Sequence, residues 1–104
     1  MTPRVPIPTA AIADFCRKWH VTEFALFGSV VRDDFGPDSD VDVLVSFAPD
    51  VRYSLFDLVD MQDELVAIFE RKVDLVTRRA VERSMNEWRR KAILESLVPV
   101  NLPS

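Results

Sequence analysis

The stretch Asp40-Val41-Asp42-Val43-Leu44-Val45-Ser46-Phe47 carries the clearest structural signal in the sequence. It is largely apolar and rich in β-branched valine, which predicts a buried strand. Side chains two positions apart on a strand point to the same face, so Asp40 and Asp42 are expected to project together at its beginning. Two bare carboxylates about 6.6 Å apart, twice the rise per residue, repel each other. The pair is therefore the first candidate for a functional site.

Helical patterns lie on both sides of this strand. Apolar residues recur at helical spacing over residues 9–19 and again over 55–69. The second helix is expected to open with a capping box, because Ser54 is followed three positions later by Asp57. A short helix is expected to open at Ser29. One last helix is predicted from four residues at helical spacing, which are Val81, Met85, Trp88 and Ala92.

Two more apolar runs, over residues 23–27 and 72–77, predict further strands. Helices between strands predict an α/β (α+β) fold, in which a small mixed sheet is flanked by helices. At 104 residues the chain is expected to form one domain over 1–104. Prolines predict an extended arm over residues 1–8 and a tail over 99–104.

Composition narrows the classes of partner. The formal net charge is −4 and the sequence pI is about 4.9, which makes nucleic acid an unlikely main partner. Basic residues gather late in the chain, and we interpret them as a solvated helix face, with a partner-binding surface as the alternative. No apolar run approaches the ~20 residues of a membrane span. The single Cys16 and the absence of a hydrophobic leader predict a cytoplasmic protein.

A third carboxylate, Asp74, lies in the apolar run 72–77. It would join Asp40 and Asp42 if the two strands are neighbours in the sheet. Carboxylate oxygens suit Mg²⁺, which keeps open positions for water and substrate phosphates. Two such ions can bridge the attacking and leaving oxygens of a displacement at phosphorus. The three aspartates are therefore predicted as metal-binding and catalytic residues.

Residues just before the aspartates have the chemistry of a phosphate site. Gly28 allows close approach of the backbone, and Ser29 supplies a hydroxyl where a helix is expected to begin. Arg32, one turn later, can reach a phosphate oxygen. We therefore predict Gly28, Ser29 and Arg32 as nucleotide-binding residues.

The segment Phe27-Gly28-Ser29, ten intervening residues and Asp40-Val41-Asp42 resembles the signature of polymerase-β-like nucleotidyltransferases. The surrounding chain from Leu26 to Phe47 resembles the minimal (MNT-type) members, and the strand with Asp74 also matches. One departure is Asp33, which stands where many minimal members carry glycine. The resemblance covers most of residues 9–77.

This resemblance implies an activity and a partner. Asp40 and Asp42 would bind two Mg²⁺ ions, Asp74 would share one and help activate the acceptor hydroxyl, and ATP would be the donor. Many minimal members resemble antitoxins paired with an all-helical HEPN ribonuclease toxin, and such an antitoxin can transfer AMP to a tyrosine of the toxin. A homo-oligomer is also possible.

Two alternatives belong to other classes of function. A catalytically weak antitoxin could neutralise its partner by contact without transfer. A small-molecule transferase could modify an antibiotic, but the known enzymes use a second lobe, for which 104 residues leave little room. The intact Gly28-Ser29 pair and the three aspartates favour the enzyme over the pure binder.

Overall fold

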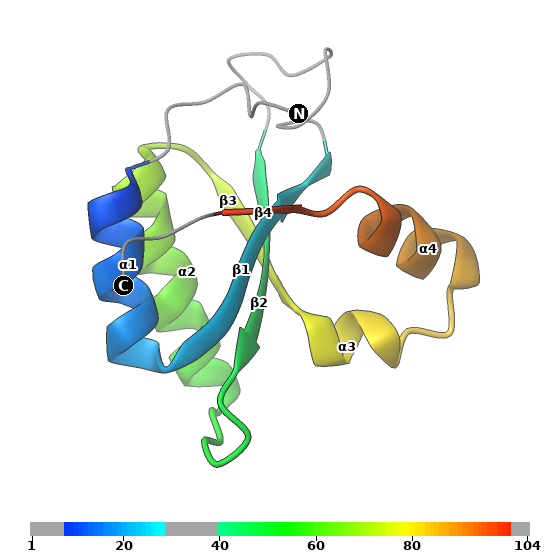
Figure 1. The fold of residues 1–104 in the computed structure, drawn as a ribbon, viewed down its shortest axis with the longest axis horizontal. Helices are drawn as coiled ribbons and strands as arrows, with labels where there is room; N and C mark the ends of the chain where they lie inside the picture. Colours follow the sequence, from blue (N-terminus) through cyan, green and yellow to red (C-terminus); the bar gives the residue numbers. More distant parts are fainter. Residues whose placement is uncertain (1–7, 29–39, 101–104) are drawn as a thin grey trace.

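A four-stranded sheet with helices on both faces forms the framework of the protein (Figure 1). The computed structural model describes residues 8–28 and 40–100. In chain order, its elements are α1 (Thr9–Trp19), β1 (Val21–Phe27), β2 (Val41–Phe47), α2 (Leu55–Phe69), β3 (Val73–Thr77), α3 (Arg78–Glu82), α4 (Glu87–Glu95) and β4 (Val98–Pro99). The expected α+β fold with a small mixed sheet is confirmed. The short helix expected at Ser29 falls outside the described residues.

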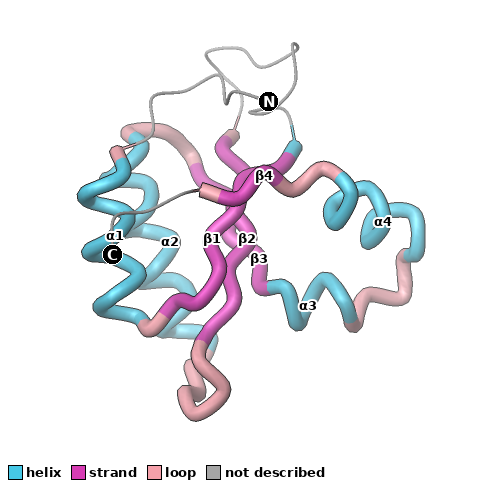
Figure 2. The backbone as a smooth tube through the Cα atoms, in the orientation of Figure 1, coloured by secondary structure: helices cyan, strands magenta, loops and turns pink. Residues whose placement is uncertain are grey.

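The strands lie in the order β3-β2-β1-β4, so β2 has β3 on one side and β1 on the other. β2 runs antiparallel to β1 and parallel to β3, and β4 pairs antiparallel with β1. Figure 2 shows the strands between the helices α1 and α2 on one side and α3 and α4 on the other. A parallel pair needs a crossover, and α2 supplies it between β2 and β3. Neighbouring β2 and β3 meet the condition on which Asp74 could join the other carboxylates.

The main core lies between the sheet and the helices α1 and α2. Alternate residues of the strands point to this side, including Val41, Val43 and Val45 of β2. From the helices, Ile12, Phe15 and Met61 are buried against them. This apolar layer fixes which residues of β2 face the other way, and Asp42 is among them.

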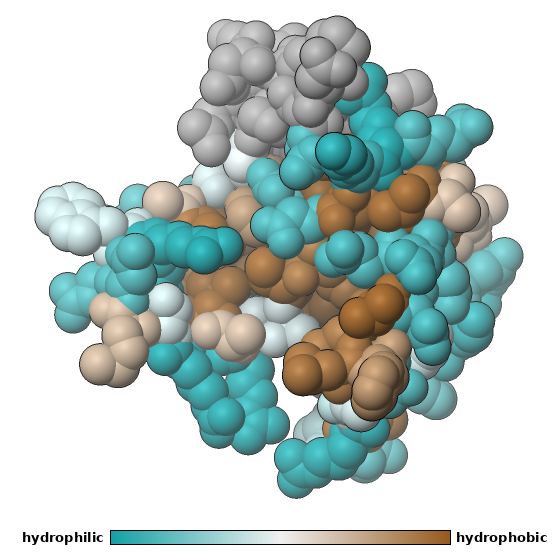
Figure 3. Space-filling model, turned by 180° about the vertical axis from the view of Figure 1, so that it is seen from behind, coloured by the Kyte–Doolittle hydropathy of each residue, from teal (hydrophilic) through white to brown (hydrophobic). Residues whose placement is uncertain are grey.

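The opposite face of the sheet has a smaller core. Phe27 of β1 and Leu44 of β2 pack there with Val81 of α3 and Ile93 of α4. Figure 3 shows the molecule from behind, with apolar side chains at the centre and hydrophilic side chains around them. The polar residues discussed below lie on the same face as this smaller core.

The capping box expected at the start of α2 is present. The Ser54 backbone N–H donates to Asp57 Oδ2 at 2.9 Å, and the Asp57 N–H donates to Ser54 Oγ at 3.3 Å. Both bonds satisfy donors that a helix N-terminus otherwise leaves without partners.

The single last helix expected from the sequence is wrong, because the chain forms two short helices there. Thr77 caps α3 by accepting from the Ala80 N–H, and Asn86 caps α4 by accepting from the Arg89 N–H. Because Asn86 caps a new helix, the four apolar residues do not lie on one continuous helix as their spacing implied. Met85 and Trp88 are accordingly 96% and 87% exposed instead of packed in a core.

The end of the described chain also differs from expectation. Pro99, assigned to the tail, belongs to β4, which pairs with β1, and the Val100 N–H donates to Phe24 O at 3.0 Å. Within residues 8–28 and 40–100, no helix combines the length and the apolar character needed to cross a membrane.

Candidate active site

Asp42 and Asp74 occupy the same position on neighbouring strands. Their Cα atoms are register partners in the parallel pair β2–β3, so both side chains leave the same face of the sheet. This face is the one opposite α1 and α2. The register continues into β1, where Phe27 is the partner of Asp42. Two carboxylates thus lie side by side at the beginning of two parallel strands.

Asp40 precedes the first residue of β2, and its side chain is exposed. The next residue is held in place, because the Val41 N–H donates to Lys72 O on the neighbouring segment at 2.9 Å. Asp40 therefore sits beside the Asp42–Asp74 pair along the chain, at the same end of the sheet.

Gly28 lies directly against the carboxylate of Asp42. Its φ is +75°, in a region that side-chain-bearing residues rarely adopt. A Cβ built there would overlap Asp42 Oδ2 and lie 3.2 Å from Asp42 Cγ. Glycine is thus required by both conformation and space. Sequence reasoning assigned Gly28 to phosphate binding but missed this contact with Asp42, which no sequence pattern signals.

The structure brings together only part of the predicted constellation. In the part of the chain that it describes, no three His, Cys, Asp or Glu side chains lie close enough to hold one metal ion. Asp42 and Asp74 form a carboxylate row, in which the two residues lie side by side on neighbouring strands. Asp40 does not join them in a group of three carboxylates. Ser29 and Arg32 lie outside the described residues. The donor chemistry of the carboxylates, and the Asp42–Asp74 register, still fit a hard cation such as Mg²⁺.

A small cavity opens farther along this face, between the sheet and the helices α3 and α4. Its volume is about 190 Å³, and its apolar lining includes Val76, Val81 and Ile93. Val76 is two residues after Asp74 on β3, so the two side chains point to the same face. The cavity therefore begins one step along the same face from Asp74, about 6.6 Å at the rise of a strand.

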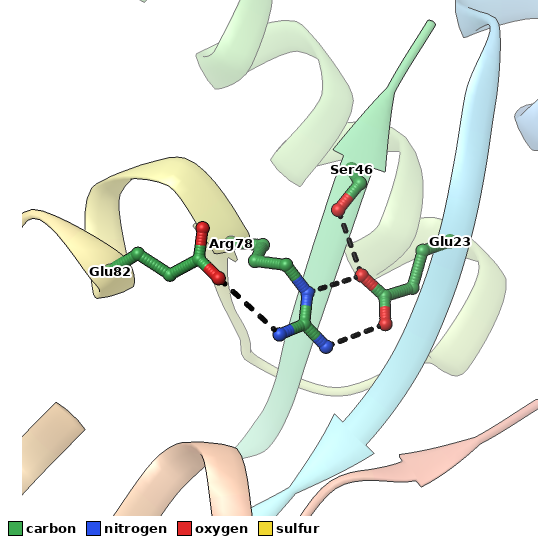
Figure 4. A network of polar contacts seen from close by, with 4 residues as sticks. All are labelled: Glu23, Ser46, Arg78 and Glu82. Carbon is green, nitrogen blue, oxygen red and sulfur yellow. Dashed lines mark hydrogen bonds and ion pairs between the residues drawn. The ribbon is translucent and has the colours of Figure 1, made fainter. Parts of the chain in front are cut away.

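The far end of the same face carries a second polar group, which sequence reasoning missed. Arg78 forms a two-point ion pair with Glu23, with Nε–Oε1 and Nη2–Oε2 distances of 2.7 Å each (Figure 4). Ser46 Oγ donates to Glu23 Oε1 at 2.8 Å, and Glu82 lies 3.7 Å from Arg78 Nη1. Glu23 and Arg78 are 55 positions apart in the sequence, so only the folded sheet reveals the pair.

Ionisation follows this geometry. The hydrogen bonds from Arg78 lower the pKa of Glu23 below its ordinary 4.5, more strongly than burial raises it. The same contact raises the pKa of Arg78. Cys16, on α1, has its pKa raised by burial to about 11, which keeps the thiol protonated and unreactive at neutral pH.

Comparison with known proteins places this geometry in context. Residues 10–100 match the family model described as "Nucleotidyltransferase domain". Protein adenylyltransferase MntA of Thermococcus cleftensis is 32% identical over 94 residues, which are 90% of this chain and 89% of the relative. A Methanocaldococcus jannaschii protein, provisionally named protein adenylyltransferase MJ0128, is 37% identical over 84 residues, or 80% of each chain.

A solved structure supports the same fold. A toxin–antitoxin complex crystallised with AMP-PNP contains a chain that superposes with a TM-score of 0.70 at 18% identity, over 94% of this chain and 76% of that one. At that identity the likeness concerns the fold.

Proposed function

The chain belongs to the family of nucleotidyltransferase domains, and we propose that it transfers AMP from ATP to a hydroxyl group of a partner protein. The observation that carries this proposal is the register of Asp42 with Asp74, with Gly28 against the Asp42 carboxylate. Adjacent carboxylates of like charge repel each other, and a bound cation would relieve that repulsion. The arrangement therefore supports catalysis better than a purely structural role.

We assign the metal-binding role to Asp40, Asp42 and Asp74, which would hold two Mg²⁺ ions. When bound, Mg²⁺ neutralises phosphate charge and polarises the phosphorus under attack. Rigid strands position Asp42 and Asp74 better than loops would. Gly28, Ser29 and Arg32 would contact the triphosphate.

The proposed reaction balances as a displacement at phosphorus. The acceptor oxygen forms a bond to the α-phosphorus of ATP, and the bond from that phosphorus to the bridging oxygen of the β-phosphate breaks. Pyrophosphate leaves with the electron pair, and the proton of the acceptor hydroxyl passes to the carboxylate of Asp74. The cavity beside Val76 has room for part of an aromatic ring, as a nucleobase or a tyrosine acceptor requires.

For the partner, we propose an all-helical HEPN-type ribonuclease toxin, with one of its tyrosines as acceptor and this chain as antitoxin. The name of the Thermococcus cleftensis relative states protein adenylyltransferase activity for that protein. The solved complex with AMP-PNP pairs an antitoxin with a toxin. These relatives support the proposal, and the acceptor of this chain has to be identified by experiment.

The test is transfer of label from ATP labelled at the α-phosphate to a purified HEPN-type protein encoded by the gene beside that of this chain, with and without Mg²⁺. We expect labelling of a tyrosine that requires Mg²⁺ and disappears in the double variant Asp40→Asn with Asp42→Asn. Asp60→Asn, an exposed carboxylate on α2, serves as the matched control and should label normally.

Two outcomes would contradict the proposal. No label on a folded and bound partner would exclude transfer to that protein. Neutralisation of the toxin that persists in the double variant would instead support the antitoxin that works by contact without catalysis.

A further inference from the structure

A broad groove lies at the end of the sheet opposite the aspartates. Two adjoining hollows of about 500 and 440 Å³ share Phe47, Arg52 and Arg79 in their walls. They open where β2 and β3 both end, beyond Phe47 and Thr77. In open sheets, the carboxyl ends of parallel strands are a recurrent position for ligands. In Figure 1 the turn after β2 lies at the bottom, and the lower edge of the molecule is indented in Figure 3.

The charge of this groove is opposite to that of the whole chain. Four arginines and one glutamate line the two hollows, which leaves a formal charge of +3 in a chain of −4. Arg78 is engaged by Glu23 and Glu82. The guanidinium groups of the other three, Arg52, Arg79 and Arg83, form no hydrogen bond or ion pair with the described residues. Three exposed cations therefore remain available to an anionic ligand.

The groove and its rim are also apolar. Phe47, Val51 and Leu58 line the smaller hollow. The first turns of α2, which supply Leu58, also expose Leu55 and Phe56, at 78% and 84%. Arginine and large apolar side chains together are typical of protein–protein interfaces. A nucleic acid would use the arginines but leave the exposed leucine and phenylalanine in water, and the net charge of −4 would repel it.

We propose that this groove docks an acidic, partly apolar segment of the protein that carries the acceptor hydroxyl. The inference rests on the proposed function for the identity of that protein, while the groove is separate from the carboxylate row. Ser46, at the groove, is four positions after Asp42 on β2, which is about 13 Å at the rise of a strand. One partner can therefore hold the groove with one segment and present a hydroxyl to the aspartates with another.

The experiment measures binding of fluorescent synthetic peptides to the full chain by anisotropy, without ATP. The probe is a peptide in which glutamates alternate with leucines. The comparison ligands have glutamine or lysine in place of glutamate, and oligouridylate tests for nucleic acid. We expect the glutamate peptide to bind best, and added salt to weaken it.

Variants at exposed positions locate the site. Arg83→Glu should weaken the glutamate peptide about tenfold, and Arg52→Glu with Arg83→Glu more than that. Lys91→Glu makes the same charge change on α4, away from the groove, and should leave binding within about twofold. The double variant should gain affinity for the lysine peptide, which a merely misfolded protein would not do.

Several outcomes would overturn the proposal. They are equal binding of the glutamate and glutamine peptides, an unchanged affinity in Arg83→Glu, and tighter binding of oligouridylate than of the glutamate peptide. Transfer of AMP without peptide binding would reject the groove and leave the proposed function standing. Peptide binding without transfer of AMP would support the groove and reject the proposed function.

Discussion

The two ends of the β2–β3 pair differ in how they arrange charge. At the beginning of the strands, Asp42 and Asp74 place two negative charges side by side. At the other end, Glu23 is matched by Arg78 in a two-point ion pair, and further arginines line a groove. Both groups lie on the face of the sheet that α3 and α4 partly cover.

Some of these charged residues stabilise the fold, and the others are arranged to bind a ligand. Glu23 and Arg78 satisfy each other, so their contact contributes to stability without any partner. The aspartate pair brings like charges together, and Arg52, Arg79 and Arg83 of the groove form no ion pair with the described residues, so each set has the charge that an outside group of opposite sign would compensate. Substitutions at the two ends should therefore change different measurements.

The largest expected effect is on catalysis at the aspartate end. Asp74→Asn should lower the rate of AMP transfer on the order of 10³-fold, because it removes a proposed metal ligand and proton acceptor worth several kcal/mol. Single-turnover labelling of the partner measures this. Glu23→Gln, at the other end, should transfer at nearly the normal rate. Comparable losses in both variants would remove the distinction between the two ends.

Gly28→Ala should have the second largest effect. The added methyl group overlaps Asp42, and displacement of a reacting group by about 1 Å can cost about 10²-fold in rate. The positive φ should also lower the free energy of unfolding by about 1–2 kcal/mol. Transfer assays and urea denaturation measure the two parts. Thr22→Ala, exposed on the same strand, is the control, and normal activity of Gly28→Ala would argue against the close contact with Asp42.

Glu23→Gln should mainly reduce stability. We expect a loss of about 1–2 kcal/mol at neutral pH, since the variant breaks a charge-assisted pair whose side chains are about one third exposed. Glu82→Gln is the matched control, with a longer contact to the same arginine and therefore a smaller loss.

The pH dependence of this loss has a defined sign. Folding lowers the pKa of Glu23 below 4.5, so its contribution is complete above that pH and disappears as the pH falls through the lowered pKa. The difference in unfolding free energy between wild type and Glu23→Gln should therefore shrink in urea denaturation below about pH 4.5. A difference that stays constant down to acid pH would mean that the ion pair contributes nothing.

The smallest expected effect is a gain in stability. Without Mg²⁺, Asp74→Asn should raise the free energy of unfolding by about 0.5 kcal/mol, because like charges directly opposite on paired strands are destabilising. Chemical denaturation in a chelator measures it. Asp60→Asn on α2 should show no such gain. Destabilisation by Asp74→Asn would indicate a structural role for this carboxylate.

Local signals made part of the fold predictable. The capping box of Ser54 and Asp57 acts over three residues, and the valine-rich run of β2 has a strand pattern that does not depend on distant contacts. The spacing of Val81 and Met85 was misleading, because Asn86 starts a new helix and Met85 faces water. Pro99 gave no sign of pairing with β1, which requires the distant Ala25.

The individual residues of the candidate site were predictable from the sequence, but the contacts between them were not. The sequence places Asp42 and Asp74 on strands, but their meeting depends on β2 and β3 being neighbours in this register. The contact of Gly28 with Asp42 and the pairing of Glu23 with Arg78 are long-range consequences of the same sheet. Ser29 and Arg32 stay predictions. Arg78, Arg79 and Arg83 belong to the late basic group, which the sequence predicts as a solvated helix face, while Arg52 lies outside that group. The hollow between β3, α3 and the turn after β2 has no local pattern that would bring them together.

Pro99 has a consequence for how the protein avoids self-assembly through its sheet. β4 is the outermost strand on the β1 side of the described sheet, and it consists of Val98 and Pro99. A proline offers no N–H to an incoming strand, and so short a strand presents little backbone for edge-to-edge pairing. Replacing Pro99 by valine would add a backbone N–H donor at the edge of β4, and a strand of another molecule could then pair with it.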